Sequence, residues 1–200
     1  MSGDFRLDRA QVRRAFARAA RIYEQHDALQ REVGQRLREQ LALCENPPQR
    51  ILDLGAGTGL GAAALARHYP EAHVIALDLA LPMLHAARRH AGWRGRRYAR
   101  VAGDAPQLPF ADGVFDLLHS NLCIQWIADP RPLFVELLRV LRPGGFLLLS
   151  SFGHGGDGCV RRARRFMGVA CCCCSVASAS SRRSTSPDVC AADSAMRSRA

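Results

Sequence analysis

The first part of the chain shows the apolar spacing of amphipathic helices. Between residues 9 and 43, apolar positions recur at helical spacing with arginines between them. A first stripe comprises Val12, Ala15, Phe16, Ala19, Ile22 and Tyr23, and a second comprises Leu29, Val33, Leu37 and Leu41. Asn46-Pro47-Pro48 ends the pattern, because the residue before a proline disfavours the helical conformation. Residues 1–46 are therefore predicted to form a helical lid.

From residue 50 to residue 152, short apolar strands alternate with helices. Strands are expected at residues 50–54, 73–77, 98–102, 114–119 and 146–151, and helices at residues 60–68, 82–90 and 133–140. Pro143-Gly144-Gly145 separates the last helix from the last strand. Such alternation is typical of a parallel sheet with crossover helices. The sequence thus predicts an α/β domain over residues 47–153, with five parallel strands flanked by helices.

Residues 154–200 have a different composition. Leucine, isoleucine, glutamate, asparagine and glutamine are absent, and Arg, Ser, Ala, Cys and Gly dominate. Such a segment has too little apolar surface to order itself, so a disordered tail is predicted. It is either a natural tail or the product of a reading-frame shift near residue 153, and we favour the frame shift. The run Cys171 to Cys174 lacks the spacing of structural zinc sites, so no metal is expected.

Composition and charge limit the partners and the location that the sequence predicts for this protein. The net charge of +10 comes from 28 arginines, since the chain has no lysine. A basic net charge suits an acidic protein partner as well as it suits a nucleic acid. Before residue 153 the arginines form no long run, which weakens the nucleic-acid interpretation. No apolar run is long enough for a transmembrane helix, and arginines interrupt any signal-peptide core near the N-terminus. We therefore predict a monomeric cytoplasmic protein that binds neither membrane nor nucleic acid.

The sharpest motif is Ile-Leu-Asp-Leu-Gly-Ala-Gly-Thr-Gly at residues 51–59. An apolar strand leads into a glycine-rich turn that opens a helix, and free N–H groups at such a helix start can receive an anionic group. The turn residues Gly55, Ala56, Gly57 and Gly59 are therefore candidates for ligand contact. Asp53, just before the turn, is a candidate partner for a cationic group.

Carboxylates also end the second and third strands. Asp78, followed by Leu79, lies about 20 residues past the glycines, where a carboxylate can accept both hydroxyls of a ribose. Asp104, followed by Ala105, lies where a carboxylate can bind an adenine amino group. An NAD-dependent dehydrogenase would also explain the glycines and Asp78, but not the segment around Asp104. For Asp116, at the start of the fourth strand, we expect either a solvated turn carboxylate or a structural role.

Across residues 50–152 this ordered series resembles the class I S-adenosylmethionine (SAM) dependent methyltransferases. Residues 141–145, Leu-Arg-Pro-Gly-Gly, resemble their usual turn before the fifth strand. The resemblance implies a Rossmann-like fold in which the glycine turn receives the methionine carboxylate of SAM and Asp53 faces its ammonium group. Members of this class continue with two more strands, one antiparallel, and neither is visible in this sequence. We therefore expect the fifth strand to be an exposed edge and the substrate half of the site to be incomplete.

Two segments point to one family within the class I SAM-dependent methyltransferases. Residues 16–24, Phe-x-x-x-Ala-x-x-Tyr-Glu, and residues 121–126, Asn-Leu-x-x-Gln-Trp, resemble the malonyl-carrier-protein O-methyltransferases of biotin synthesis. They resemble more loosely relatives that act on trans-aconitate and a mitochondrial complex-I assembly factor. By this resemblance Asn121 would contact the cofactor and Gln125 or Trp126 the substrate. Tyr23 would cap the pocket. Ordinary core packing of Trp126 and Tyr23, and solvent exposure of Gln125, remain equally open.

The resemblance implies methyl transfer from SAM to the free carboxylate of a malonyl thioester on acyl carrier protein, which primes pimeloyl synthesis for biotin. Because this carboxylate is ionised near pH 7, no general base is required, and catalysis depends on alignment and exclusion of water. An arginine is expected to orient the substrate carboxylate, but the sequence does not single one out. The alternatives are a methyltransferase of another small carboxylic acid, a hydroxylase of protein arginine with the same fold, and a truncated, non-catalytic SAM-binding remnant.

Overall fold

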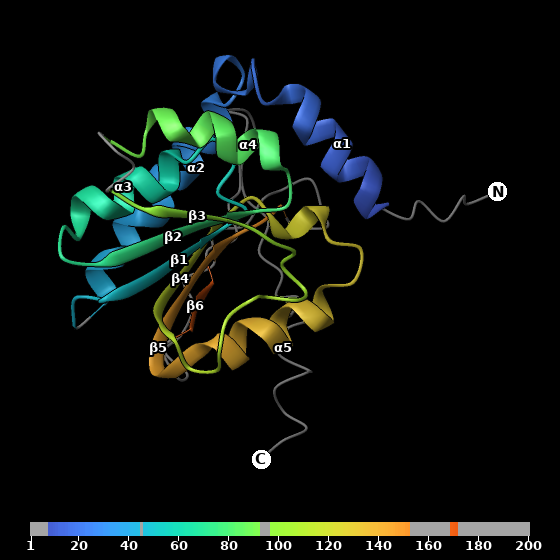
Figure 1. The fold of residues 1–200 in the computed structure, drawn as a ribbon. Coiled ribbons are helices and arrows are strands. Elements are labelled where there is room, and N and C mark those ends of the chain that lie inside the picture. Colours follow the sequence, from blue (N-terminus) through green and yellow to red (C-terminus); the bar gives the residue numbers. More distant parts are fainter. Residues whose placement is uncertain (1–7, 45, 93–96, 153–168, 172–200) are drawn as a thin grey trace, which may run out of the picture.

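The computed structural model describes residues 8–44, 46–92, 97–152 and 169–171. Figure 1 shows a twisted sheet with helices on both faces, and all its strand pairs are parallel. The strand order is β3-β2-β1-β4-β5-β6. The bounds are Arg50–Leu54 for β1, His73–Asp78 for β2, Ala99–Ala102 for β3, Phe115–Asn121 for β4, Leu141–Ser150 for β5 and Val169–Cys171 for β6. The predicted α/β class and parallel sheet are confirmed.

The direction of strand addition reverses between β1 and β4. The chain moves outward from β1 through β2 to β3, and then returns to add β4 and β5 on the other side of β1. In open parallel sheets, ligands bind outside the carboxyl ends of the strands at such a reversal. The fold therefore places the glycine turn after β1 at the point where a ligand is expected.

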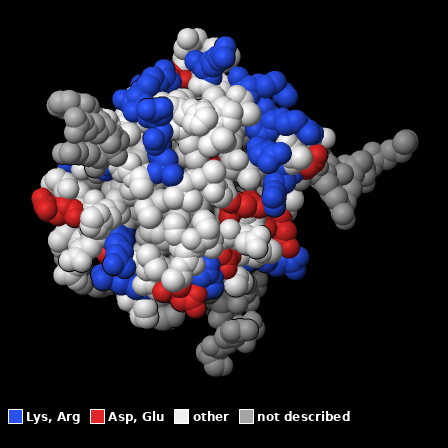
Figure 2. All heavy atoms as spheres, viewed as in Figure 1, with Lys and Arg blue, Asp and Glu red and all other residues white. Residues whose placement is uncertain are grey.

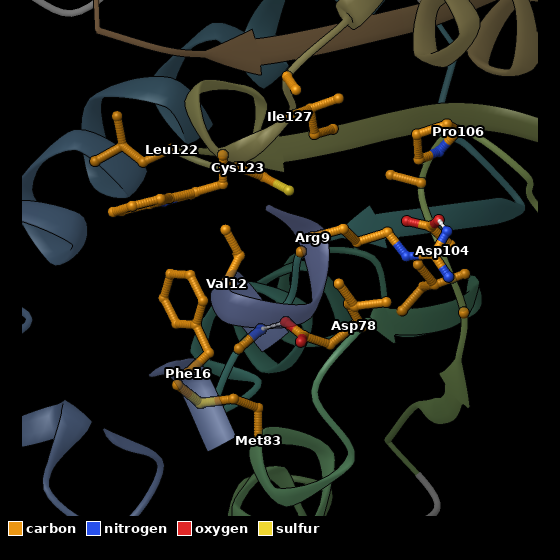
Figure 3. A pocket seen from close by; sticks show the side chains of 18 of the residues that line it. Arg9, Val12, Phe16, Asp78, Met83, Asp104, Pro106, Leu122, Cys123 and Ile127 are labelled. Atoms are coloured by element: carbon orange, nitrogen blue, oxygen red, sulfur yellow. Dashed lines mark hydrogen bonds and ion pairs between the residues drawn. The ribbon is translucent and has the colours of Figure 1, made fainter. Parts of the chain in front are cut away.

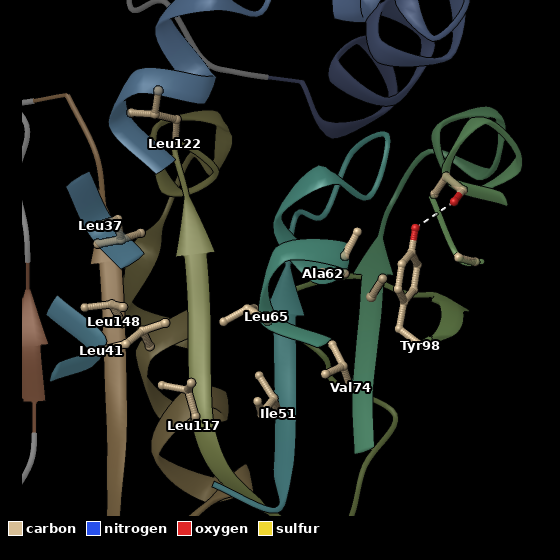
Figure 4. Packing of buried hydrophobic residues seen from close by; sticks show 14 of the residues in the cluster. Leu37, Leu41, Ile51, Ala62, Leu65, Val74, Tyr98, Leu117, Leu122 and Leu148 are labelled. Atoms are coloured by element: carbon tan, nitrogen blue, oxygen red, sulfur yellow. Dashed lines mark hydrogen bonds between the residues drawn. The ribbon is translucent and has the colours of Figure 1, made fainter. Parts of the chain in front are cut away.

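The central strands are buried on both faces, as their continuous apolar sequences require. Four of the five β1 residues and six of the seven β4 residues are buried. Helices α2 (Ala28–Glu39) and α3 (Leu60–His68) cover one face, where Leu37 and Leu65 pack with Ile51 and Leu117 (Figure 4). Helix α5 (Pro130–Val140) covers the other face. This two-sided core holds the strand ends in fixed positions.

Asp116 joins the start of β4 to the start of β1. Its Oδ2 accepts hydrogen bonds from the backbone N–H groups of Gln49 (2.6 Å) and Arg50 (2.8 Å). Its Oδ1 forms an ion pair with Arg142 at 2.8 Å. Of the two roles expected for Asp116, the structural one is therefore confirmed.

The N-terminal helical region is broken into separate elements. Helix α1 (Arg9–Ala19) is followed by the 3₁₀ turn η1 (Tyr23–Gln25), then by α2 and the 3₁₀ turn η2 (Gln40–Leu43). The two apolar stripes serve different surfaces, which is why the helix breaks between them. The α2 stripe buries Val33 and Leu37 against the sheet, whereas α1 has no fully buried residue. Helix α1 lies instead above the carboxyl ends of the strands, near α4 (Leu81–Ala86) (Figure 1).

The sheet differs from expectation at β5 and beyond. Strand β5 begins at Leu141, directly after α5, and takes up residues 142–145 as an irregularity in its pairing with β4, where a separate turn was predicted. Strand β6 pairs with β5 through three residues, so β5 is not the exposed edge that we expected. No apolar period predicts this strand, because three residues are too few to show one. Almost all of the predicted disordered tail lies outside the described residues.

Candidate cofactor pocket

A cavity of about 320 Å³ lies at the carboxyl ends of β1, β2, β3 and β4 (Figure 3). The turn after β1 and the ends of β2 and β3 supply its floor, which we define as Gly55, Gly57, Asp78 and Asp104. Helix α1, η1 and the segment after β4 cover it with a roof, which we define as Arg9, Phe16, Tyr23 and Trp126. The volume lies within the usual range for small-molecule pockets.

The glycine turn requires a left-handed backbone. Gly55, Gly57 and Gly59 have φ angles of +68°, +54° and +83°, which residues with a side chain rarely adopt. A Cβ atom on Gly55 would lie 2.5 Å from Sγ of Cys123, so a glycine is also required there by packing. A Cβ atom on Gly57 would meet nothing within 4 Å, because this residue faces open space. The turn therefore presents bare backbone to the cavity.

Asp78 fixes the glycine turn and also faces the cavity (Figure 3). Its Oδ2 accepts a hydrogen bond from the Gly57 N–H and its Oδ1 accepts one from the Ala80 N–H, both at 2.8 Å. Burial raises the pKa of this carboxyl, and the two backbone hydrogen bonds oppose that rise. Each carboxylate oxygen keeps a free lone pair, so Asp78 can still accept hydroxyl groups of a ligand.

Asp104 pairs with an arginine from the roof. Arg9, at the start of α1, lies with its Nη1 2.5 Å from Oδ2 of Asp104. The side chain of Arg9 is 69% exposed and that of Asp104 is 19% exposed, so this contact closes the rim of the cavity. The ion pair joins the roof to the floor across 95 residues of sequence. Arg9 carries no sequence signal that distinguishes it from the other arginines.

Asp53 lies beneath the floor and does not line the cavity. Its Oδ1 lies 2.7 Å from Nδ1 of His119, which is its register partner on β4, and both side chains are almost completely buried. Asp53 shares a face of the sheet with Asp78, but it lies one pleat further from the strand ends. Its Oδ2 and His119 Nε2 are buried and have no hydrogen-bond partner in the described part of the chain.

Asn121 lines the cavity, but its amide also ties three elements together. Its Nδ2 donates to the carbonyl oxygen of Gln30 in α2, and its Oδ1 accepts from Oγ of Ser150 in β5, both at 2.8 Å. The next residue, Leu122, has a φ angle of +51°, which turns the chain across the strand ends. Cys123 then points into the cavity, and burial, followed by the charge of Asp78, raises its pKa to about 12. This thiol is therefore neutral near pH 7.

The roof is aromatic. Phe16 meets Trp126 of η5 (Ile124–Trp126) edge to face, with ring centroids 5.2 Å apart and planes at 88°. Tyr23 lies 6.2 Å from Phe16 in a tilted arrangement. Burial raises the pKa of Tyr23, and the negative charges of Asp27 and Asp78 add to the rise. These rings exclude water from one side of the cavity while Trp126 stays 43% exposed.

The structure brings most of the predicted site residues together. Those that line the cavity are Tyr23, Gly55, Gly57, Asp78, Leu79, Asp104, Ala105, Asn121 and Trp126. Those outside its wall are Asp53, Ala56, Gly59 and Gln125. Gly59 begins α3 and turns toward Tyr98, and Gln125 has its Oε1 buried within η5. Sequence reasoning missed Arg9 as a lining residue. It noted Val12 only as a member of an apolar stripe, and Phe16 as a member of that stripe and of the first family-like segment.

Comparison with known proteins identifies relatives of known name. The family described as a methyltransferase domain matches residues 52–149. Malonyl-[acyl-carrier protein] O-methyltransferases of Xylella fastidiosa and Gallionella capsiferriformans are 48% and 41% identical to this chain. The alignments cover 76% and 75% of this chain, and 51% and 53% of the relatives. The chain therefore spans about half the length of these relatives.

Solved structures share the fold. A protein of Methanococcus maripaludis assigned to the SAM-dependent methyltransferases superimposes with a TM-score of 0.61 at 21% identity, covering 68% of this chain and 64% of that one. Phosphoethanolamine N-methyltransferase 2 of Haemonchus contortus, solved with S-adenosylhomocysteine, gives a TM-score of 0.51 at 32% identity, covering 63% and 30%. At 21% identity the first of these supports the fold alone.

The described residues were also searched for metal sites and for membrane-spanning helices. They contain no group of three or more His, Cys, Asp or Glu side chains placed to hold a metal ion. None of their helices is long and apolar enough to cross a membrane. Strand order, the glycine turn and the domain match agree, and the described part of the chain has the fold of the class I SAM-dependent methyltransferases.

Proposed function

We propose that this protein binds SAM in the pocket and transfers its methyl group to the free carboxylate of a malonyl thioester on acyl carrier protein. The observation that carries the proposal is the pocket floor, where a bare glycine turn and two carboxylates lie at successive strand ends. The 48% identity to a malonyl-[acyl-carrier protein] O-methyltransferase supports the choice of substrate. By this proposal the product enters biotin synthesis, and the protein acts as a cytoplasmic monomer.

The pocket suits SAM in size and in the order of its polar groups. Gly57 leaves open space above the turn, where a methionine carboxylate would approach backbone N–H groups. Asp78 would accept the ribose hydroxyls, while Asp104 would accept the adenine amino group. Leu79 and Met83 supply apolar surface for the adenine ring. Asp53 would act indirectly, since it supports β1 from below and does not reach the cavity.

The lining chemistry suits an acceptor that is already ionised. When bound, SAM would supply a methyl group on a positively charged sulfur. Cys123 is a neutral thiol near pH 7, and Tyr23 is held in its protonated form by its raised pKa. Neither side chain can therefore serve as a general base at that pH. A malonyl carboxylate needs none, so the pocket has only to align the reactants and exclude water, as the roof is built to do.

The first experiment is a calorimetric titration of the purified chain with SAM, beside the Asp78→Ala variant. We expect saturable binding that the variant loses, because the carboxylate is the main polar contact for the ribose. Methyl transfer would then be measured by mass spectrometry with malonyl-loaded acyl carrier protein. Acetyl-loaded carrier protein is the matched control, since it lacks the free carboxylate. Methylation of both carrier proteins, or of neither, contradicts the proposed reaction.

A second candidate is a SAM-binding remnant without turnover. It is favoured by the short β6, which pairs with β5 through only three residues. In that case SAM binds, the Asp78→Ala variant loses binding, and malonyl-loaded carrier protein stays unmethylated. The same two measurements therefore separate the two functions.

A further inference from the structure

We propose that the outer side of α1 is the docking surface for the acidic carrier protein that delivers the substrate. We define the α1 basic face as Arg13, Arg14 and Arg18 of α1 together with Arg21 in the turn that follows it. All four arginines are exposed, and none forms an ion pair with a carboxylate of the described residues. Figure 2 shows basic side chains along the edge of the molecule where Figure 1 places α1. This inference rests on the proposed function.

The two sides of α1 serve different purposes. Arg9, Val12 and Phe16 point inward and line the cavity. Arg14 and Arg18 are four residues apart, which places them on one side of the helix, away from the apolar stripe. The helix is therefore both the roof of the pocket and the surface that an approaching partner meets. A partner held on this surface would keep a tethered thioester beside the cavity.

Arginines elsewhere in the described residues either pair with an acidic residue or lie on an element that does not line the cavity. Arg31, Arg36, Arg131 and Arg139 pair with acidic residues of their own helices or with the cap residue just before them. Several exposed arginines, such as Arg50 and Arg67, lack such a partner, but they lie on elements that contribute nothing to the cavity wall.

An acidic protein fits the α1 basic face better than a smaller anion does. Four positive charges that have no acidic partner among the described residues extend over about two helical turns and the turn that follows, which suits a charged protein surface. The named relatives act on a substrate carried by a protein, so charge steering would raise the rate at which that protein docks. Carrier proteins are generally acidic, which supplies the complementary charge.

The test compares two charge-reversed variants with equal change in net charge. Arg14→Glu/Arg18→Glu alters the α1 basic face, and Arg50→Glu/Arg67→Glu is the matched control on other elements. Binding of fluorescently labelled malonyl-loaded carrier protein is followed by anisotropy at low and at high salt. We expect about tenfold weaker binding for the first variant at low salt and less than about twofold change for the control. The difference should shrink at high salt. Thermal unfolding of each variant shows that the fold is kept.

Equal weakening in both variants, or no weakening in the first, overturns the proposal. Loss of binding to anionic vesicles or to RNA in the first variant, with carrier-protein binding unchanged, also overturns it and assigns the surface to that other partner. Methyl transfer to free malonyl-pantetheine separates docking from chemistry, since this small thioester needs no protein contact. We expect the first variant to keep that rate. If the unmodified protein cannot methylate malonyl-loaded carrier protein, the proposed reaction is contradicted, while carrier-protein binding still decides the docking surface.

Discussion

The pocket floor and the pocket roof consist of different kinds of chemical group. The floor consists of backbone and half-buried carboxylates held at the ends of neighbouring strands, and its geometry is set by the strand register. The roof consists of side chains on α1, η1 and η5, which meet one another through aromatic contacts and meet the floor through one ion pair. The floor is therefore rigid and suited to hold a cofactor of constant shape. The roof is held more weakly and is suited to admit and release ligands.

The largest expected effect lies beneath the floor. His119→Leu removes the hydrogen-bonded partner of a buried carboxylate, so we expect stability to fall by about 3–5 kcal/mol. The double variant Asp53→Val/His119→Leu replaces both groups with apolar side chains and should recover most of that loss. Urea denaturation followed by circular dichroism measures both. If the double variant is no more stable than His119→Leu, the pair does not support the floor in this way.

The second effect concerns the floor itself. Asp78→Asn removes the charge that would accept ribose hydroxyls, and we expect SAM affinity to fall about 10- to 100-fold, as for loss of charged hydrogen bonds worth about 1.5–3 kcal/mol. Asp129→Asn is the matched control, because Asp129 also lines the cavity but caps α5 and pairs with Arg131. Calorimetry should show less than about a threefold change for this control. Similar losses in both variants would mean that general charge, and not the position of Asp78, determines affinity.

The third effect compares the roof with the core. Phe16–Trp126 and Phe110–Phe115 have nearly the same edge-to-face geometry, with centroids 5.2 Å and 4.9 Å apart. Trp126 is 43% exposed, whereas Phe115 is 1% exposed. Phe115→Ala is the reference for a fully buried ring and should cost as much as the largest effect, about 3–5 kcal/mol of stability. A double-mutant cycle on Phe16 and Trp126 should give a coupling of only about 0.5–1.5 kcal/mol. A roof coupling near zero would show that α1 does not rest on η5 in solution.

The contrast between floor and roof also explains what the sequence could reveal. Glycines and strand-end carboxylates are local signals, and Gly57, Asp78 and Asp104, which these signals single out, all line the cavity. The depth of Asp53 depends on how β1 pairs with β4, which no local pattern records. The contact of Arg9 with Asp104 depends on where α1 lies over the sheet. Sequence patterns thus indicate which residues end a strand, but not which distant side chain covers them.

The smallest effect is the dependence of SAM affinity and of folding stability on pH. The titration of Asp78 in the floor should change these two quantities in opposite directions. Because burial raises the pKa of Asp78, its carboxylate takes up a proton at higher pH than an exposed aspartate does. SAM affinity should therefore decline as the pH falls through the raised pKa, and the loss in Asp78→Asn sets the limit of that decline. Folding stability should respond in the opposite direction. A raised folded-state pKa means that the folded protein binds more protons, so the contribution of Asp78 to stability grows as the pH falls from the raised value toward the ordinary value of 3.8.

Other carboxylates act against this trend, because hydrogen bonds from Arg131 and Arg139 lower the pKa of Asp129 and Glu136 and make acid destabilising at those sites. The measurement must therefore be the difference in unfolding free energy between the unmodified protein and Asp78→Asn across pH, beside their SAM affinities. Opposite slopes of affinity and of this stability difference would assign the titration to the floor. Parallel slopes would instead show that acid weakens SAM binding by loosening the whole domain, the roof included.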